Sequence, residues 1–169
     1  MTNEDEKVQA TIKTFAKTLP KFPDGRINYS DADTAPVITA FIQYSDEILL
    51  LKRSENVSTY QEKWNTVAGY LDEIKPLRKK ILEELSEEIN ISEDNILSHH
   101  IGESYTFTDP TIGKTWIVYP ALVKLRCKPS IRLDWEHTEY RWIKPRELRN
   151  FNHVPKLDQS LGKIMKWID

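Results

Sequence analysis

The sequence predicts an α+β fold, an α/β/α sandwich in which a mixed β-sheet is flanked by helices, with extra helices at both ends of the chain. Apolar residues at helical spacing predict one helix over residues 3–19 and another from Leu157 to Ile168. Runs rich in Val, Ile, Leu and Phe predict strands at 35–44 and 48–52. A third apolar stripe, from Leu77 to Ile89, predicts a helix within the strand region.

The other elements follow from turn residues and apolar runs. Ser45 and Asp46 separate the first two strands and predict a hairpin, whereas the three prolines of residues 19–36 predict an irregular connector. Pro76 is expected to open the central helix, where a missing N–H costs least. Further strands are expected at 64–71, 96–107, 115–125 and 139–143, with a helical turn at 145–150.

The length of 169 residues fits one domain with its own hydrophobic core. We therefore expect a single domain over residues 1–169. Its N-terminal helix and connector occupy 1–34, its core 35–150 and its C-terminal helix 151–169. The sequence leaves a homodimer open, with the N-terminal helix and Trp167 of the C-terminal helix as the candidate contact.

Composition and charge exclude several classes of protein. Apolar residues make up 39% and charged residues 30%, which is typical of a folded soluble domain. The net charge of -2, with both signs scattered, provides no basic stripe for nucleic acid, and no apolar run approaches the ~20 residues of a membrane span. Because the acidic start lacks a signal-peptide pattern and the lone Cys127 cannot form an internal disulfide, we expect a cytoplasmic protein with Cys127 buried.

Three glutamates lie along one edge of the central helix. At about 100° per residue, Glu84, Glu87 and Glu88 cluster beside the apolar stripe. Like charges at this spacing destabilise an isolated helix, and desolvation adds to the cost. Mg2+ or Mn2+ would satisfy them, because these ions prefer oxygen ligands and no His or Cys accompanies the cluster. The alternative interpretation is an ordinary solvated helix face.

The surrounding segment resembles the Nudix box, G-x5-E-x7-R-E-U-x-E-E-x-G-U, where U is a bulky aliphatic residue. The matching residues are Gly69, Glu84, Leu85, Glu87, Glu88 and Ile91. The strand at 48–53 and Trp64 resemble what precedes the box in that family, and residues 136–148 resemble its C-terminal signature. The resemblance covers roughly residues 35–150, most of the chain.

The box departs from the family pattern at several positions. Lys75 and Glu83 exchange the signs of a family ion pair, so our hypothesis is that they pair with each other. Asn90 replaces the last glycine and is compatible with the left-handed conformation that ends helices. Ala68 replaces a glycine but keeps its backbone carbonyl. Lys80 stands where the family prefers a small residue, and nothing in the sequence explains it.

The resemblance implies an enzyme that hydrolyses a diphosphate bond with Mg2+ or Mn2+ as its cofactor. The metal ligands that it implies are the carbonyl of Ala68 and the carboxylates of Glu84, Glu87 and Glu88. Family members differ in where the general base lies. The candidate catalytic residues are therefore Glu84 and Glu87 on the helix and Glu136 and Glu139 beyond it, although the last two are equally well explained as surface carboxylates.

Two residues are candidates for substrate binding. Arg53 could pair with a substrate phosphate, although an exposed arginine at a strand end is more often merely solvated. Tyr70 could stack on a nucleobase, although aromatics in strands usually serve the core. His99 and His100 face opposite sides of a strand and receive no role.

The expected partner is a small nucleotide diphosphate, such as ADP-ribose, a dinucleoside polyphosphate or a nucleoside triphosphate, and the sequence does not choose among them. Loops 54–63 and 108–114 are expected to set that choice. The alternative function is a nucleotide-binding or regulatory module with weak or no catalysis, which Lys75 and Glu83 favour and the complete acidic cluster opposes. Diphosphate isomerase chemistry is disfavoured because no cysteine motif surrounds Cys127.

Overall fold

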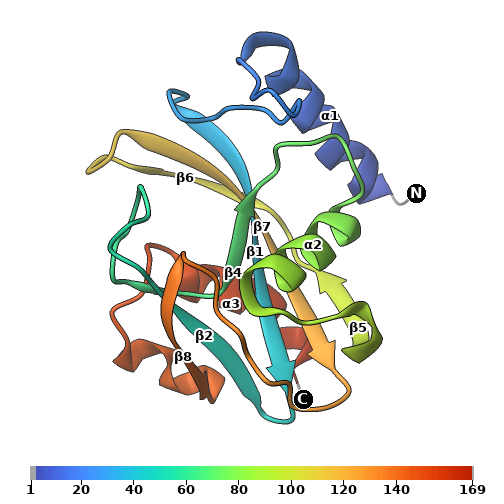
Figure 1. Cartoon of the computed structure of the whole chain (residues 1–169), viewed down its shortest axis with the longest axis vertical. Helices are drawn as coiled ribbons and strands as arrows, with labels where there is room; N and C mark the ends of the chain where they lie inside the picture. The colour runs from blue at the N-terminus through green and yellow to red at the C-terminus, as the bar shows by residue number, and fades with distance from the viewer. Residues whose placement is uncertain (1–2, 169) are drawn as a thin grey trace.

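The computed structural model describes residues 3–168 and has one mixed sheet between helices (Figure 1). The helices are α1 (Asn3–Thr18), α2 (Leu77–Ile89) and α3 (Leu157–Ile164), with short 3-10 turns η1 (Glu93–Asn95), η2 (Pro145–Asn150) and η3 (Met165–Trp167). The strands are β1 (Thr34–Tyr44), β2 (Glu47–Arg53), β3 (Trp64–Asn65), β4 (Val67–Tyr70), β5 (Ile96–Ile101), β6 (Tyr105–Asp109), β7 (Lys114–Leu125) and β8 (His137–Ile143).

Strands β1 and β7 form the centre of the sheet. They pair in parallel from Thr34 opposite Thr115 to Gln43 opposite Lys124, whereas the other strand pairs are antiparallel. Strands β1 and β2 form the predicted hairpin, in which Ser45 takes a left-handed conformation with φ 56°. The mixed sheet of the predicted α+β class is therefore confirmed.

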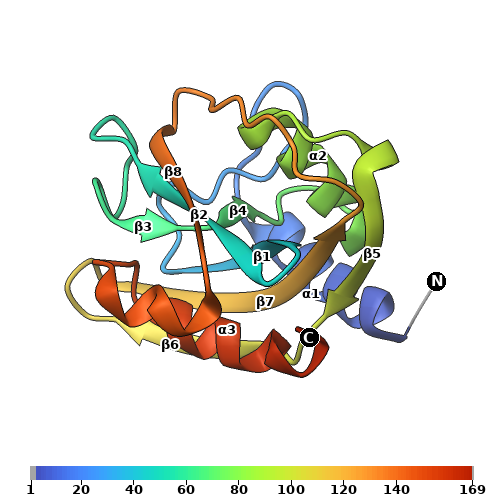
Figure 2. The same cartoon turned by 90° about the horizontal axis from the view of Figure 1, so that it is seen from below.

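The two faces of the sheet bury separate apolar clusters, as the alternation of side chains along a strand requires. Ile38, Ala40 and Ile42 of β1 join one cluster, to which α1 contributes Val8 and Ile12 and to which α2 adds its apolar stripe. Phe41 joins the other cluster, which α3 covers. Figure 2 shows α2 and α3 on opposite sides of the sheet, so the predicted layer order is observed.

Two predicted strands are each divided. Residues 96–107, expected as one strand, form β5 and β6, which both pair with β7. The chain bends at Gly102, where a Cβ would lie only 3.0 Å from the carbonyl oxygen of Lys163. Residues 64–71 form β3 and β4, separated at Thr66, whose hydroxyl donates to the Ala40 carbonyl at 2.9 Å. The apolar runs were read correctly, but these breaks depend on contacts with distant segments.

Two expectations about the end of β7 and the C-terminal helix need correction, and the homodimer stays a prediction. Cys127 is exposed and lies beyond β7, with its Sγ 3.2 Å from the Asn95 side-chain oxygen, and is not buried as expected. The C-terminal α-helix ends at Ile164 and continues as η3. Trp167, the candidate dimer contact, stacks on His100 of the same chain with ring centroids 5.1 Å apart.

The described residues cover the predicted domain except at its two ends. Residues 1, 2 and 169 of the predicted 1–169 domain lie outside the described range. Between residues 3 and 168, no helix has both the length and the apolar character of a membrane span.

Helix α1 is tied to the rest of the chain, because the Asp5 carboxylate accepts a hydrogen bond from the Leu77 backbone N–H at 3.2 Å. Pro76 is the residue just before α2. The hydrogen bond between Asp5 and Leu77 therefore connects α1 to the first residue of α2.

Asn90 ends α2 in the left-handed conformation expected of it, with φ 60° and ψ 39°. The Asn90 N–H donates to the Ser86 carbonyl and the Ile91 N–H to the Leu85 carbonyl, which closes the last turn. Asn tolerates this conformation better than residues with branched side chains do.

We predict that Asn90→Val lowers the free energy of unfolding by about 1–2 kcal/mol, the usual cost of left-handed backbone for such a residue, whereas Asn90→Gly does not lower it. Urea denaturation of both variants and the wild type measures the difference. Equal stability of Asn90→Val and wild type would show that this helix end carries no such constraint.

Candidate functional site

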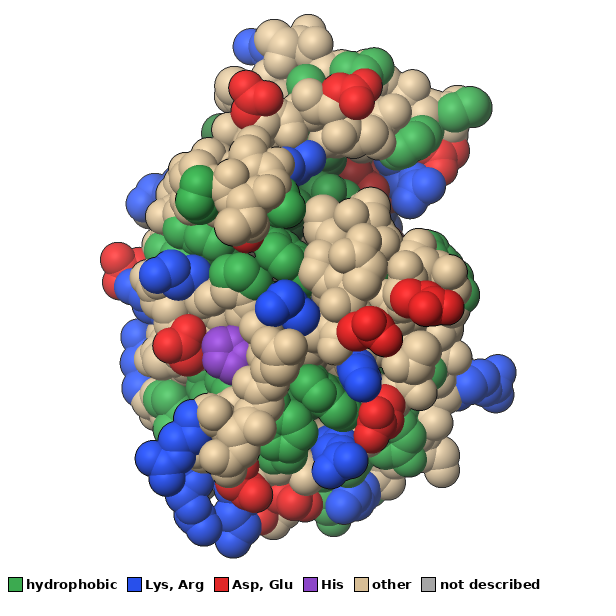
Figure 3. Space-filling view, turned by 90° about the vertical axis from the view of Figure 1, so that its left-hand side faces the viewer, with side chains coloured by type: hydrophobic (Ala, Val, Ile, Leu, Met, Phe, Trp, Pro, Cys, Tyr) green, Lys and Arg blue, Asp and Glu red, His purple; other side chains and the backbone are tan. Residues whose placement is uncertain are grey.

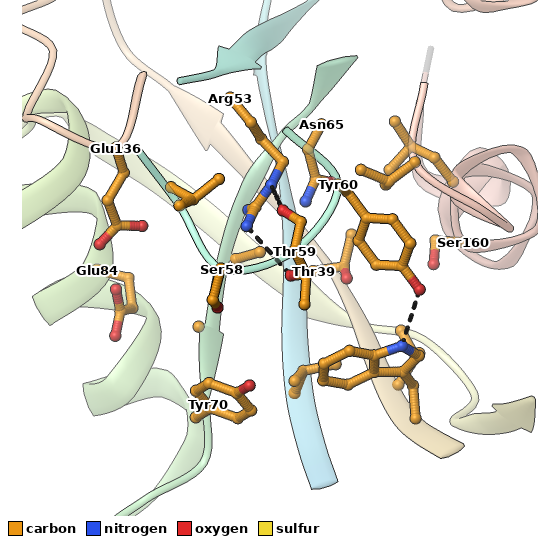
Figure 4. Close-up of a pocket in the computed structure, with 18 of the residues that line it drawn as sticks. Thr39, Arg53, Ser58, Thr59, Tyr60, Asn65, Tyr70, Glu84, Glu136 and Ser160 are labelled. Atoms are coloured by element: carbon orange, nitrogen blue, oxygen red, sulfur yellow. Dashed lines mark hydrogen bonds between the residues drawn. The ribbon is translucent and has the colours of Figure 1, made fainter. Parts of the chain in front are cut away.

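A cavity of about 350 Å³ opens between α2, the central strands and the start of α3. Figure 4 shows Glu84 and Glu136 together at one end of the cavity, Tyr60 and Ser160 at the other end and Arg53 between them. The face in Figure 3 carries apolar side chains with charged side chains of both signs around them. The cavity therefore joins an acidic end to a basic and aromatic wall.

Helix α2 places its three candidate glutamates in two different environments. The apolar stripe, with Leu77, Ile81, Leu85 and Ile89, is buried in the core, as its spacing predicted. Glu84 and Glu87 line the cavity. Glu88 lies behind the cavity wall and is only 2% exposed, so the three carboxylates share one side of the helix but not one surface.

Gly69 of β4 allows Glu84 to approach the backbone closely. A Cβ at Gly69 would lie 2.7 Å from both Cδ and Oε1 of Glu84, closer than such atoms are found. Any other residue would therefore displace the carboxylate. Ala68, the predicted source of a metal-binding carbonyl, also lines the cavity next to Gly69.

Glu88 is a buried acid with incomplete hydrogen bonding. Its Oε2 has no hydrogen-bond partner, which is uncommon for a buried polar atom. Burial, followed by the charges of Glu84 and Glu136, raises the pKa of Glu88 well above its ordinary value. The negative charge of Glu84 contributes to the raised pKa of Glu88, so the ionisation of one acid opposes that of the other.

Of the two candidate bases beyond the helix, the structure brings only Glu136 to the cavity. Burial raises the pKa of Glu136 to about 7, and Asp134 and Glu84 add to this effect. Glu139 instead lies on β8, where it pairs with Arg141 at 3.2 Å. The prediction of Glu139 as a catalytic candidate therefore has no support in the geometry, because neighbouring positions on a strand need not reach the same site.

Sequence reasoning missed His137 and Asp134. His137 is buried, with Nδ1 3.1 Å from Asp134 Oδ1 and Nε2 3.6 Å from Glu88 Oε1. Burial lowers the pKa of His137, which favours the neutral ring. Both residues flank Glu136 in the sequence, and this adjacency was the only signal that could have indicated them.

Arg53 faces the cavity and is not the solvated strand end of the alternative interpretation. Its Nε donates to the Thr59 carbonyl at 3.0 Å, which fixes the side chain across the cavity wall. Burial lowers the pKa of Arg53, and the charges of Glu136 and Glu88 oppose that effect. The guanidinium therefore stays charged in a site where a phosphate could reach it.

Aromatic side chains form the wall opposite the acids. Tyr70 lines the cavity and also stacks on Tyr29 with ring centroids 5.3 Å apart, so it packs partly in the core and its role in substrate binding stays a prediction. Trp116 lies beside Tyr70 and donates from Nε1 to the hydroxyl of Tyr60 at 3.1 Å. Tyr60, which sequence reasoning did not single out, also donates to Asp109 at 2.8 Å.

Asn65 provides a polar group on the same wall. It is 7% exposed, lines the cavity, and its side-chain oxygen has no hydrogen-bond partner. Because the two ends of an amide are distinguished only by their partners, either end could face the cavity. Asn65 can therefore contact a bound molecule through a donor or an acceptor.

Lys80, unexplained by the sequence, lies among buried acids. Its Nζ is 2.9 Å from Asp72 Oδ1 and 3.0 Å from Glu84 Oε1, and its side chain is 8% exposed. Burial lowers the pKa of Lys80, but the charges of Glu84 and Asp72 together have the larger effect. The pKa is therefore raised above its ordinary value, and the ammonium remains charged. A lysine fits here because two carboxylates surround its amine.

Lys75 and Glu83 form the ion pair hypothesised from their exchanged signs. The Lys75 Nζ lies 2.8 Å and 3.0 Å from the two carboxylate oxygens of Glu83 and 3.1 Å from Glu73. The pair ties the loop before α2 to the middle of the helix. The hypothesis that these two residues pair with each other is thus confirmed.

The acidic end fits a divalent cation by its chemistry. Glu88 has an unsatisfied oxygen, the pKa values of Glu84, Glu88 and Glu136 are raised, and an oxygen-preferring ion would relieve both effects. Within residues 3–168, no three Asp, Glu, His or Cys side chains are grouped so that they could hold a metal ion as they stand. The assignment of Ala68, Glu84, Glu87 and Glu88 as metal ligands therefore stays a prediction.

Comparison with known proteins gives a consistent match. A model of the NUDIX domain matches residues 33–168. A MutT protein from Methanosarcina mazei Go1 is similar in structure, with TM-score 0.66 and 21% identity over 81% of this chain and 96% of that one. No curated protein sequence matches this chain.

Two further solved structures are similar. A C. elegans Ap4A hydrolase binary complex has TM-score 0.63 and 20% identity, covering 80% of this chain and 97% of that one. A bifunctional NMN adenylyltransferase/ADP ribose pyrophosphatase from Francisella tularensis, complexed with AMP and a manganese ion, has TM-score 0.64 and 15% identity, covering 98% of this chain and 48% of that one. At these identities the likeness shows the fold.

We predict that Lys75→Glu combined with Glu83→Arg retains more hydrolytic activity than either single substitution, because the double variant restores an attractive pair between the loop and α2. Glu73 beside position 75 makes the rescue incomplete. Initial rates of the four proteins on one nucleotide substrate measure it. Equal losses in the three variants would remove the idea.

We predict that the free energy of unfolding falls as the pH rises and that Glu136→Gln makes this fall smaller. In the folded chain Glu136 keeps its proton up to about pH 7, against an ordinary pKa of 4.5. The stability from this group is therefore present below the ordinary pKa and lost as the pH rises through the raised one. Urea denaturation with a chelator between about pH 4.5 and 7 should show a shallower decline for Glu136→Gln, and parallel curves would contradict the shift.

Proposed function

Because the chain belongs to the Nudix family of pyrophosphohydrolases, we propose that it hydrolyses a diphosphate bond in a nucleoside diphosphate linked to another moiety, with Mg2+ or Mn2+. One observation carries this proposal. The cavity has acidic residues of α2 and Glu136 at one end, Tyr60 at the other end and Arg53 between them, with further aromatic side chains along its wall. A diphosphate between a metal-binding end and a stacking surface would be held at both of its sides.

The proposed metal-binding residues are Glu84, Glu87 and Glu88, with the Ala68 carbonyl. The raised pKa values of Glu84 and Glu88 and the unsatisfied oxygen of Glu88 support this role, because a bound cation would stabilise the charged carboxylates that burial disfavours. A bound ion would neutralise charge on the bridging phosphates and lower the pKa of an attacking water. The manganese reported with the Francisella tularensis protein is consistent with this choice of ion.

Glu136 is the proposed general base. It lies at the cavity beside the α2 glutamates, and its pKa of about 7 is near the value at which a carboxylate both accepts and releases protons at neutral pH. Asp134 precedes it by two residues and hydrogen-bonds the Glu136 backbone N–H at 3.2 Å, which orients this loop. Glu84 and Glu87 remain the alternative bases on the helix.

Arg53 is proposed to bind a substrate phosphate. Its Nε donates to the Thr59 carbonyl at 3.0 Å and its Nη2 to Thr59 Oγ1 at 3.5 Å, which together hold the side chain in one orientation. The guanidinium at the cavity is proposed to donate its remaining N–H groups to phosphate oxygens. This arrangement also fixes loop 54–63, of which Val57 to Tyr60 line the cavity.

The aromatic wall is proposed to bind the nucleobase. Tyr70 and Trp116 present ring surface to the cavity, and Asn65 offers an unsatisfied amide on the same wall. The cavity volume of about 350 Å³ is within the usual range for small-molecule sites. Loops 54–63 and 108–114 meet at the Tyr60–Asp109 hydrogen bond, so both can influence substrate choice, as the sequence analysis proposed.

The proposed partner is therefore a small nucleotide in the cytoplasm, not a nucleic acid or a membrane. ADP-ribose, dinucleoside polyphosphates and nucleoside triphosphates are the substrates to compare. The named activities of the similar structures, Ap4A hydrolase and ADP ribose pyrophosphatase, make the first two natural starting points.

We predict that Mg2+-dependent release of phosphate or a nucleoside monophosphate occurs on at least one member of this panel and falls about 100-fold in Glu88→Gln. The fold should survive, because Gln removes a buried charge without changing the size of the side chain. Turnover and circular dichroism on both proteins measure the two effects.

Glu139→Gln is the matched control, since Glu139 is an acid outside the cavity that pairs with Arg141. We expect it to keep wild-type turnover. Unaltered activity in Glu88→Gln would contradict the metal-binding role. Tight nucleotide binding without turnover on any member of the panel would instead favour the binding-module alternative.

A further inference from the structure

Lys80 supplies a positive charge where the acidic cluster needs one. Its ammonium lies 2.9 Å from Asp72 and 3.0 Å from Glu84, and the three side chains are 8%, 11% and 13% exposed. Water therefore screens these contacts weakly, and each charge depends on the others for compensation. Arg26 reaches Asp72 only at 3.7 Å and from a more exposed position.

The contact with Lys80 uses one of the two oxygens of Glu84. Oε1 pairs with the ammonium and also lies against Gly69, where a Cβ would come within 2.7 Å of it. A carboxylate held in this way is partly neutralised before any ion arrives. Its remaining attraction for a divalent cation is weaker than that of a free carboxylate.

We propose that Lys80 is a built-in cation of the acidic cluster, which positions Glu84 and lowers the number of divalent ions that the cluster takes up. Lys80 is a positioning residue in this role, because it acts through Glu84. The same ammonium compensates the charges of Asp72 and Glu84 when no metal is bound. Helix α2 and the loop before it therefore stay packed together without the metal. This inference rests on the proposed divalent-cation site.

The test is the binding of Mn2+ to the wild type, Lys80→Met and Lys79→Met, counted per chain by electron paramagnetic resonance of free Mn2+ and by calorimetry. Met matches the length and volume of the lysine stem without its charge. Lys79 is exposed on the same helical turn, so its substitution changes net charge equally and leaves the buried cluster intact. We expect Lys80→Met to bind one additional Mn2+ per chain and Lys79→Met to match the wild type.

Thermal unfolding gives a second readout that does not depend on catalysis. With a chelator, Lys80→Met should melt at a lower temperature than the wild type, because Asp72 and Glu84 lose their cation. Saturating Mn2+ should recover more of this loss in Lys80→Met than it adds to the wild type, since an ion that binds the folded chain stabilises it. If Lys80→Met does not fold, Lys80→Met with Asp72→Asn removes both buried charges and should show the same gain in Mn2+.

The same number of Mn2+ ions with the same affinity in the wild type and in the foldable Lys80 variant would overturn the inference, even if the variant were less stable. The wild-type measurement decides the metal-binding part of the proposed function separately. A wild type that binds no Mn2+ contradicts that part, whereas the difference between wild type and variant reports on Lys80 alone.

Discussion

The packing of the apolar stripe of α2 against the sheet is the constraint on which the candidate site depends. It places Glu84 beside Gly69 of β4, and β4 is in turn paired with β1 at the centre of the sheet. The core side chains Ile81 and Leu85 lie on the same helix, so the register that buries them also determines where Glu84 lies. Packing and chemistry are therefore set together, and a change in one would move the other.

Electrostatics at this site work against the stability of the metal-free fold. Glu84, Glu88 and Glu136 are buried acids whose pKa values are raised, which means that the fold penalises their charged forms. Lys80 offsets part of this cost at Glu84, whereas Lys75 pairs with Glu83 and Glu73 outside this group of acids. Concentrated carboxylates with incomplete compensation are typical of sites selected for function.

Much of this arrangement could be predicted from the sequence because it depends on local spacing. The period of α2 gave both its buried stripe and the side of its glutamates, and the exchanged signs of Lys75 and Glu83 gave their pairing. The choice between Glu136 and Glu139 could not be made, since it depends on where β8 meets β2. The roles of Lys80 and His137 depend on partners in other segments, and the division at Gly102 depends on a contact with α3.

The parallel pairing of β1 with β7 has a consequence for how the chain reaches this structure. Each residue of β1 meets a partner about 80 positions later, so closing this ladder confines a long stretch of polymer that includes α2. Contacts of such sequence separation slow the search for the native topology. The helix that carries the acids can form early from its own residues, but its cavity exists only after the two halves of the chain have met.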